Sequence, residues 1–151
     1  MISIIPGGDI FSSRCAAIVN AVNCEGVMGK GLAAEFKRRH PSAFLEYQDA
    51  CRKGLLRPGR CLLSYLDGEK PRFAIQFPTK DRWRRPSRIE YIELGLVDLV
   101  EQVRLHAIPS LALPALGCGL GGLSWHVVRP VIEAYFAPLD GYVDVELYGP
   151  R

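Results

Sequence analysis

The sequence predicts an α/β protein of three layers, in which helices cover both faces of a mixed central sheet. Short apolar runs alternate with longer segments of helical periodicity along most of the chain. Two glycine-rich loops each follow an apolar run and precede a helical segment, as in the parallel part of an open sheet. A hairpin signal, Asp67-Gly68, lies between two further apolar runs and adds an antiparallel pair of strands.

The first elements are two strands and two helices. Ile2–Ile5 is an apolar run closed by a Pro-Gly-Gly turn, and residues 16–22 form a second run that Asn20 interrupts. The loop NCEGVMGKG follows, and a helical pattern begins at Leu32. Pro41 suits the first turn of the next helix, which we expect to stop at Gly54.

The middle of the chain predicts a hairpin and a long helix. Residues 61–66 and 72–77 are the two strands around the hairpin signal. In residues 89–103 the apolar side chains recur every three or four positions, which is typical of a helix with one buried face. Residues 110–113 then predict a short buried strand that runs into the loop PALGCGLGGL.

The last elements are a helix and a strand. We expect Ser124 to cap a helix, and Pro130 inside the helical pattern indicates a kink or an irregular start. Apolar and polar residues alternate over residues 142–148, which predicts the final strand. No linker or internal repeat separates these elements, so we expect residues 1–151 to form one domain.

Composition is that of a globular domain, with 48% hydrophobic and 23% charged residues. No apolar run reaches the roughly 18 residues that a membrane span needs, and the amino-terminal segment lacks the features of a signal peptide. We therefore expect a cytoplasmic protein with no membrane partner. The net charge of +3 is mild, but basic residues gather at 38–40 and 81–88, which leaves nucleic-acid binding open.

Cysteine and histidine usage predicts no metal site. The five cysteines are an odd number without a C-x-x-C pair, and the three histidines lie far apart. We expect reduced thiols, no metal and no cofactor. Cys118 with His126 as its base would make a cysteine hydrolase, but no third orienting group is evident.

The two glycine-rich loops predict a ligand that carries a diphosphate. Glycine lets the backbone approach a ligand closely, and successive amide groups can hold an anion at a helix amino terminus. The alternative is that these glycines only form tight turns. Neither loop has the G-K-[ST] ending of a P-loop, and the loose GxGxxG at 117–122 lies too late for a dinucleotide fingerprint.

Three separated segments resemble the macrodomain family, whose fold binds ADP-ribose: GGDIF, IVNAVNCEGVMGKGLAAEFKRRHP and PALGCGLGGLSW. Within it, NCEGVMGKG with FK, PTK and GCGLGGL resembles the DNA ADP-ribosyl glycohydrolase (DarG) branch, the antitoxins of bacterial toxin–antitoxin pairs. That branch is related to the terminal ADP-ribose protein glycohydrolase of animals. The resemblance covers nearly the whole chain and implies the amino-terminal part of a longer antitoxin.

The resemblance implies a set of residues for each part of the ligand. Asp9 would receive the adenine amino group, with the Ile10 amide beside it, and Asn20 and Asn23 would lie near the distal ribose. Two loops would hold the diphosphate and the distal ribose: Gly26, Val27, Met28, Gly29, Lys30 and Gly31 in the first, and Gly117, Cys118, Gly119, Leu120, Gly121, Gly122 and Leu123 in the second.

Lys80, the lysine of the PTK segment, matches the catalytic residue of this branch. We expect its amine either to attack the anomeric carbon and form a covalent adduct, or to assist the leaving group. In the animal branch an aspartate follows GCGL, and Gly121 stands there in this chain. The acid–base partner is therefore unassigned. Asp81 is adjacent in sequence, but we expect it to be a solvated acid of the loop.

The segment after Lys80 predicts contact with DNA. Arg82, Arg84 and Arg85 suit phosphates, and Trp83 suits stacking on an unpaired base, although a solvated loop with Trp83 in the core is the alternative. The resemblance implies release of ADP-ribose from thymine in single-stranded DNA. A reader without turnover and a protein-directed hydrolase are the competing functions. The resemblance also implies a toxin partner, a DNA ADP-ribosyltransferase, and we expect a monomer.

Overall fold

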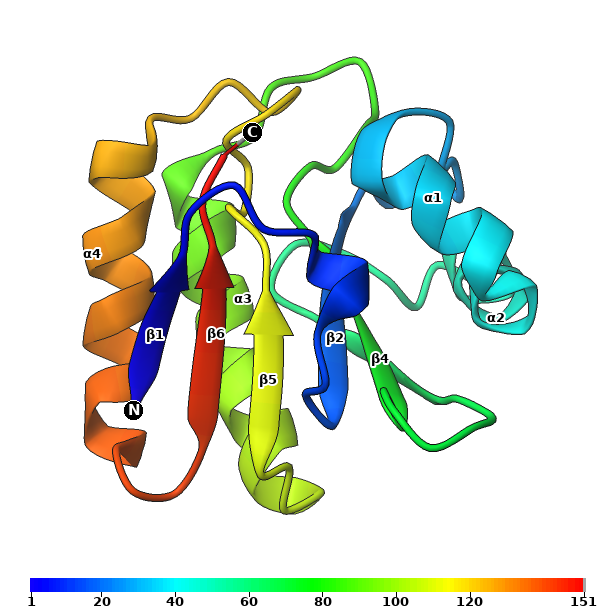
Figure 1. The fold of residues 1–151 in the computed structure, drawn as a ribbon. Coiled ribbons are helices and arrows are strands. Elements are labelled where there is room, and N and C mark those ends of the chain that lie inside the picture. Colours follow the sequence, from blue (N-terminus) through cyan, green and yellow to red (C-terminus); the bar gives the residue numbers. More distant parts are fainter. Residues whose placement is uncertain (151) are drawn as a thin grey trace.

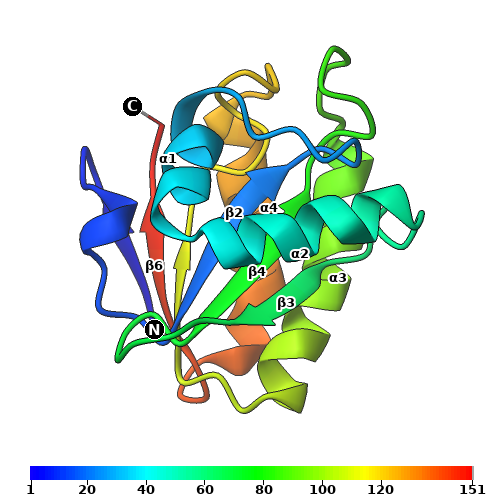
Figure 2. The ribbon, with the colours of Figure 1, turned by 90° about the vertical axis from the view of Figure 1, so that its right-hand side faces the viewer.

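The computed structural model describes residues 1–150 as three layers (Figures 1 and 2). In chain order its strands and helices are β1 (Ile2–Ile5), η1 (Ile10–Ser12), β2 (Ala17–Val22), α1 (Gly31–Arg39), α2 (Pro41–Arg52), β3 (Leu62–Tyr65), β4 (Phe73–Pro78), α3 (Ile89–Leu105), β5 (Ser110–Leu113), α4 (Trp125–Phe136), η2 (Ala137–Leu139) and β6 (Asp144–Tyr148). One face of the sheet carries α3 and α4, and the other carries α1 and α2. The predicted three-layer α/β fold is confirmed.

The six strands form one mixed sheet in the order β1-β6-β5-β2-β4-β3. Only β3 runs antiparallel to its neighbour, and this β3–β4 pair is the predicted hairpin. The other neighbours pair in parallel. Because parallel strands end at the same edge, the loops after β2, β4 and β5 converge at the upper edge in Figure 1.

The central strand β2 is buried on both sides, which explains its almost unbroken apolar sequence. Ala17 and Val19 pack into the core under α3 and α4, whereas Ile18 and Val22 pack under α1 and α2. Side chains alternate between the two faces of a strand, so Asn20 belongs to the α1–α2 face with Ile18 and Val22.

Helix α3 follows the predicted apolar spacing. Ile92, Leu96 and Leu99 are fully buried against the sheet, and burial of each such side chain is worth about 1.5–3 kcal/mol. The helix comes close to β4 at Gly95, where an added Cβ would lie 2.3 Å from the ring of Phe77. Glycine at this position therefore sets how closely α3 approaches the sheet.

Two expectations at the end of the chain were wrong in detail. The last strand begins at Asp144, because the amide of Tyr142 turns to the carbonyl of Leu139. Ser124 occupies the N-cap position of α4, but its side chain makes no capping hydrogen bond. Pro130 lies inside α4 without ending it. Within residues 1–150, no helix combines the length and hydropathy needed to cross a bilayer.

Candidate functional site

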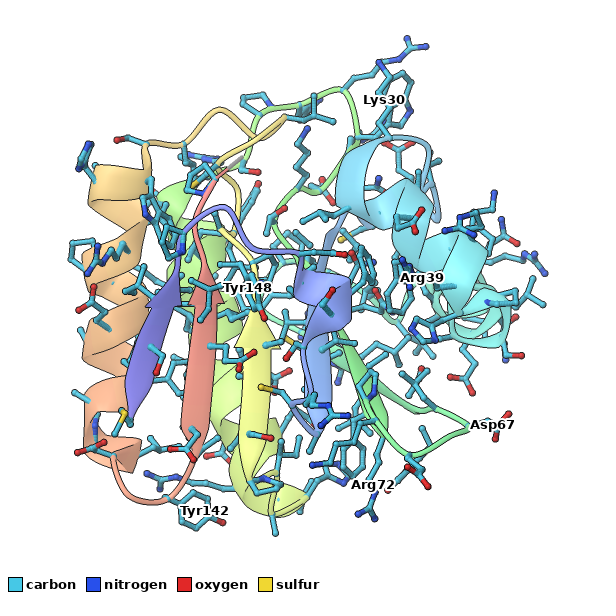
Figure 3. All side chains as sticks on the ribbon, viewed as in Figure 1. Lys30, Arg39, Asp67, Arg72, Tyr142 and Tyr148 are labelled. Carbon is cyan, nitrogen blue, oxygen red and sulfur yellow. The ribbon has the colours of Figure 1, made fainter. Side chains whose placement is uncertain are left out.

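A cleft of about 1000 Å³ lies at the edge where the parallel strands end. Its walls come from the loop before η1, the loops after β2, β4 and β5, and the end of β6. In Figure 3, Lys30 and Tyr148 lie toward this edge, and Tyr142 lies at the opposite one. The two glycine-rich loops therefore share one cavity, because the strands that precede them are neighbours in the sheet.

Most of the predicted site residues line this cleft. Those that do are Asp9, Ile10, Asn23, Val27, Gly29, Lys30, Gly31, Lys80, Trp83, Gly117, Cys118, Gly119, Leu120 and Gly121. The other predicted site residues do not line the cleft; they are Asn20, Gly26, Met28, Arg82, Arg84, Arg85, Gly122 and Leu123.

Asn20 is buried under the floor of the cleft, with 4% of its surface exposed. Its Nδ2 donates to Oε1 of Gln76 at 3.0 Å and approaches the sulfur of Met28 at 3.7 Å. Gln76 is its direct partner in the β2–β4 register, so the contact crosses between two central strands. The position of Asn20 is that of a structural residue that ties the loop after β2 to the sheet.

Asn23, just past the end of β2, organises the first glycine-rich loop. Its Nδ2 donates to the carbonyl of Val27 at 2.9 Å, and its Oδ1 accepts from the amides of Glu25 and Val27 at 2.9 and 3.4 Å. The buried Tyr47 hydroxyl donates to Asn23 Oδ1 and to its main-chain carbonyl, at 2.9 and 2.8 Å. This network holds the loop in one shape before any ligand arrives.

Lys80 lies at the mouth of the cleft, half-buried, between two loops. Its Nζ donates to the main-chain carbonyl of Trp83 at 3.4 Å and to that of Leu120 at 3.3 Å. Its own carbonyl lies 3.6 Å from the thiol of Cys24. Lys80 thus contacts the loop after β2 through its main-chain carbonyl and the loop after β5 through its amine.

The loop after β5 is closed tightly around glycines. A Cβ on Gly121 would lie 2.4 Å from the carbonyl oxygen of Gly117 and 2.3 Å from Oγ of Ser87. The amide of Ser87 also donates to the carbonyl of Gly121 at 3.0 Å. No side chain can stand at position 121 without moving the backbone, so this site has no room for an aspartate there.

The end of the cleft near Asp9 contains residues that sequence reasoning missed. Asp9 is the N-cap of η1, and its two carboxylate oxygens accept from the amide of Phe11 at 3.0 Å and from Oγ of Ser12 at 3.3 Å. Phe11 and Tyr148 also line the cleft. The Tyr148 hydroxyl donates to Glu146 at 2.8 Å, and burial together with this bond raises the pKa of Tyr148 to about 12. Only the parallel pairing of β1 with β6 brings Tyr148 to this place.

Arg39 forms part of the wall beside Phe11. Its guanidinium lies over the Phe11 ring at 4.9 Å and pairs with Glu35 at 2.7 Å. Arg38 shares the same carboxylate. Hydrogen bonds from Arg38 and Arg39 lower the pKa of Glu35 to about 2, so this carboxylate stays charged and compensates the two cations.

The thiols of Cys118, which lines the cleft, and of Cys24, next to the Lys80 carbonyl, are poor nucleophiles. Burial raises the pKa of the Cys118 thiol to about 11. Burial, reinforced by the Asp81 carboxylate, raises the pKa of the Cys24 thiol to about 12. Thiolate stabilisation by the glycine-rich loop would shift the Cys118 pKa in the opposite direction, so this loop does not activate the Cys118 thiol. Within residues 1–150, no cluster of three or more His, Cys, Asp or Glu side chains could hold a metal ion.

The basic segment after Lys80 lies on the surface. Arg82, Arg84 and Arg85 are exposed, and Trp83 is exposed rather than packed in the core. The guanidinium of Arg84 lies 4.7 Å from the centre of the Trp83 ring. The alternative with Trp83 in the core is therefore wrong.

Comparison with known proteins agrees with this geometry. Residues 19–132 match the family described as Macro domain. Curated relatives named DNA ADP-ribosyl glycohydrolase, from Mycobacterium tuberculosis and Thermus aquaticus, are 44% and 43% identical over 95% of this chain. The chain spans about two fifths of the length of these relatives, 41% and 40%.

Two solved structures carry the same fold. The macrodomain of Mycobacterium tuberculosis DarG superposes with a TM-score of 0.97 and 41% identity, over 100% of this chain and 99% of that one. Thermosipho africanus DarTG in complex with ADP-ribose superposes with a TM-score of 0.90 and 39% identity, over 99% of this chain and 41% of that one. From the family match, the identities and the fold together, the chain belongs to the Macro domain family.

Proposed function

We propose that this chain is a DNA ADP-ribosyl glycohydrolase, which removes ADP-ribose from thymine in single-stranded DNA and so reverses the modification made by a toxin. The observation that carries the proposal is the position of the Lys80 amine at the mouth of the cleft, between the carbonyls of Trp83 and Leu120. The names of the relatives from Mycobacterium tuberculosis and Thermus aquaticus support the same activity.

In this proposal ADP-ribose lies along the cleft. Asp9 and the Ile10 amide face adenine, and the loops at 26–31 and 117–123 hold the diphosphate and the distal ribose. Backbone amides and glycines suit this task because they approach anionic oxygens closely. Asn23 acts by shaping the first loop. Asn20 supports that loop through its contact with Met28 rather than by touching the ribose.

Lys80 then acts on the bond between the sugar and the base. Its amine attacks the anomeric carbon through the nitrogen lone pair and the carbon–nitrogen bond to the base breaks. The base leaves with the bonding electrons and takes up the proton that the lysine nitrogen loses. Ring opening of the lysine–sugar adduct gives an imine. Water adds to this imine, releases ADP-ribose and regenerates the amine. Protonation of the leaving base by Lys80 is the simpler alternative route.

The exposed arginines place the DNA strand next to Lys80. Arg82, Arg84 and Arg85 contact phosphates on either side of the modified nucleotide, and Trp83 contacts a base. Such a domain would work as a monomer in the bacterial cytoplasm. A relative from Thermosipho africanus is named a DNA ADP-ribosyl transferase–DNA ADP-ribosyl glycohydrolase fusion protein, which supports a cognate transferase toxin as the partner, held in part by a region outside this chain.

One assay tests the function against its competitors. The protein is incubated with ADP-ribosylated single-stranded DNA and, separately, with ADP-ribosylated protein, and free ADP-ribose is measured. The proposal expects release from DNA by the wild type and none by Lys80→Ala, while both bind free ADP-ribose. Binding without release from either substrate would identify a reader. Release from protein alone would identify a protein-directed hydrolase.

A further inference from the structure

Three apolar side chains stand exposed around the mouth of the cleft. Val27 is 42% exposed, Trp83 43% and Leu120 71%, and all three line the cleft. They come from three different loops, after β2, β4 and β5. Single exposed apolar residues are common on protein surfaces, but a group of them at the mouth of a cavity marks a binding surface.

The main chain of each of these residues is fixed by hydrogen bonds. The amide and carbonyl of Val27 both bond to the Asn23 side chain. The amide of Trp83 donates to Glu25 at 3.0 Å, and its carbonyl accepts from Lys80. The carbonyl of Leu120 accepts from Lys80 as well. The side chains therefore project from a rigid rim, which lowers the entropy lost when a ligand binds.

The reacting amine lies between two members of this rim. Lys80 Nζ is 3.4 Å from the Trp83 carbonyl and 3.3 Å from the Leu120 carbonyl. ADP-ribose that occupies the glycine-rich loops would bring its anomeric carbon to this amine from inside the cleft. The group attached to that carbon must then lie outward, against the side chains of Trp83 and Leu120.

From this arrangement we propose that Val27, Trp83 and Leu120 form a subsite for a single nucleobase, the one that carries ADP-ribose. The inference rests on the proposed function and deepens it by naming what the rim selects. A planar base gains binding free energy from stacking on Trp83 and from apolar contact with Val27 and Leu120. A modified carboxylate or hydroxyl of a protein substrate would place polar atoms against this rim and gain little from it.

The rim also explains why the base must be unpaired. Its side chains come from three loops that line one cleft, so the base has to leave its stack to reach the surfaces of Trp83 and Leu120. The Arg84 guanidinium already covers the Trp83 ring at 4.7 Å. A base therefore uses the opposite face of the indole.

Alanine variants of the rim test the subsite. We expect Trp83→Ala and Leu120→Ala each to lower kcat/KM for an ADP-ribosylated single-stranded oligonucleotide about 10-fold, the loss of one stacking or apolar contact. The Kd of Trp83→Ala for free ADP-ribose should stay within about two-fold of the wild type, and Trp83→Phe should restore most of the loss because it keeps a flat ring. Leu105→Ala and Tyr142→Ala are matched controls, since these residues are 75% and 53% exposed and lie outside the cleft.

The result that overturns the subsite is an unchanged kcat/KM in both rim variants, or an equal loss of affinity for free ADP-ribose. The proposed function fails separately, if the wild type releases nothing from the oligonucleotide. In that case the uncleaved oligonucleotide serves as a binding probe. The subsite then requires that the wild type bind it more tightly than free ADP-ribose and that Trp83→Ala and Leu120→Ala remove this gain.

Discussion

The amine of Lys80 donates a hydrogen bond to the main-chain carbonyl of Leu120 at 3.3 Å, although the two residues are 40 positions apart. This bond joins the loop after β4 to the glycine-rich loop after β5, and a second bond, from the Ser87 amide to the Gly121 carbonyl, reinforces the junction. Lys80 and the glycine-rich loop after β5 are thus parts of one connected structure.

A covalent mechanism predicts that Lys80 can be trapped. With ADP-ribosylated single-stranded DNA and borohydride, we expect an ADP-ribose adduct on the wild-type protein, located at Lys80 by peptide mass spectrometry. Lys80→Arg keeps the positive charge but cannot form an imine, and it should lose about 10²–10⁴-fold in rate. An active protein that yields no adduct at Lys80 would favour the route in which Lys80 only protonates the leaving base.

Substitution at Gly121 should destabilise the protein. An alanine Cβ would lie 2.4 Å from the Gly117 carbonyl oxygen, and such overpacking costs about 1–3 kcal/mol in the free energy of unfolding. Gly119→Ala is the matched control, because its Cβ would meet nothing within 4 Å. Denaturant unfolding of both variants measures the difference. Gly121→Asp should share the penalty and should not raise the rate of ADP-ribose release.

Tyr47 and Asn23 should be coupled in their contributions to the free energy of unfolding. Tyr47→Phe removes a buried hydroxyl that bonds to Asn23 at 2.8 and 2.9 Å, which should lower the free energy of unfolding by about 1–2 kcal/mol. A double-mutant cycle with Asn23→Ala should give a coupling of about 0.5 kcal/mol or more. Both single variants should also weaken ADP-ribose binding, measured by calorimetry, since the loop loses its fixed shape. Strict additivity would contradict the network.

Binding to DNA should depend steeply on salt. Each phosphate contact on a single strand contributes about 0.7 to the slope of log K against log salt concentration. Arg84→Ala and Arg85→Ala should each reduce the slope by about that amount, measured by fluorescence anisotropy. Arg104→Ala removes an exposed arginine from the last turn of α3 and is the control. If all four proteins share one slope, the arginine segment does not contact phosphates.

The thiol of Cys118 should be slow to react at neutral pH. Its pKa, raised to about 11 by burial, favours the protonated form, so little thiolate exists at pH 8. Alkylation by iodoacetamide, followed on the Cys118 peptide from pH 7 to pH 10, should be slower than for free cysteine and should accelerate as the pH rises. Rapid labelling at pH 7 would instead support a reactive cysteine in the cleft.

Sequence patterns were enough for most of the fold, because periodicity and turn residues act over a few positions. The apolar runs, the hairpin at Asp67-Gly68 and the long helix α3 all appear where they were expected. The start of β6 and the capping of α4 could not be predicted from these patterns. They depend on contacts such as the bond between the Tyr142 amide and the Leu139 carbonyl, which local composition does not specify.

The sequence by itself determined which chemical groups are available. These are two glycine-rich loops that follow strands, and a lysine at the end of another strand that is followed by arginines and a tryptophan. Only the tertiary structure decided how these parts meet. The order of the strands brings Lys80 to Leu120 and Tyr148 to the cleft. Asn20 of β2 is buried against β4, whereas Asn23 lines the cavity. The conformation of the loop after β5 leaves no space for a side chain at position 121. The physical reason is that these relationships join residues distant in sequence, and pairing and packing across the whole sheet set them.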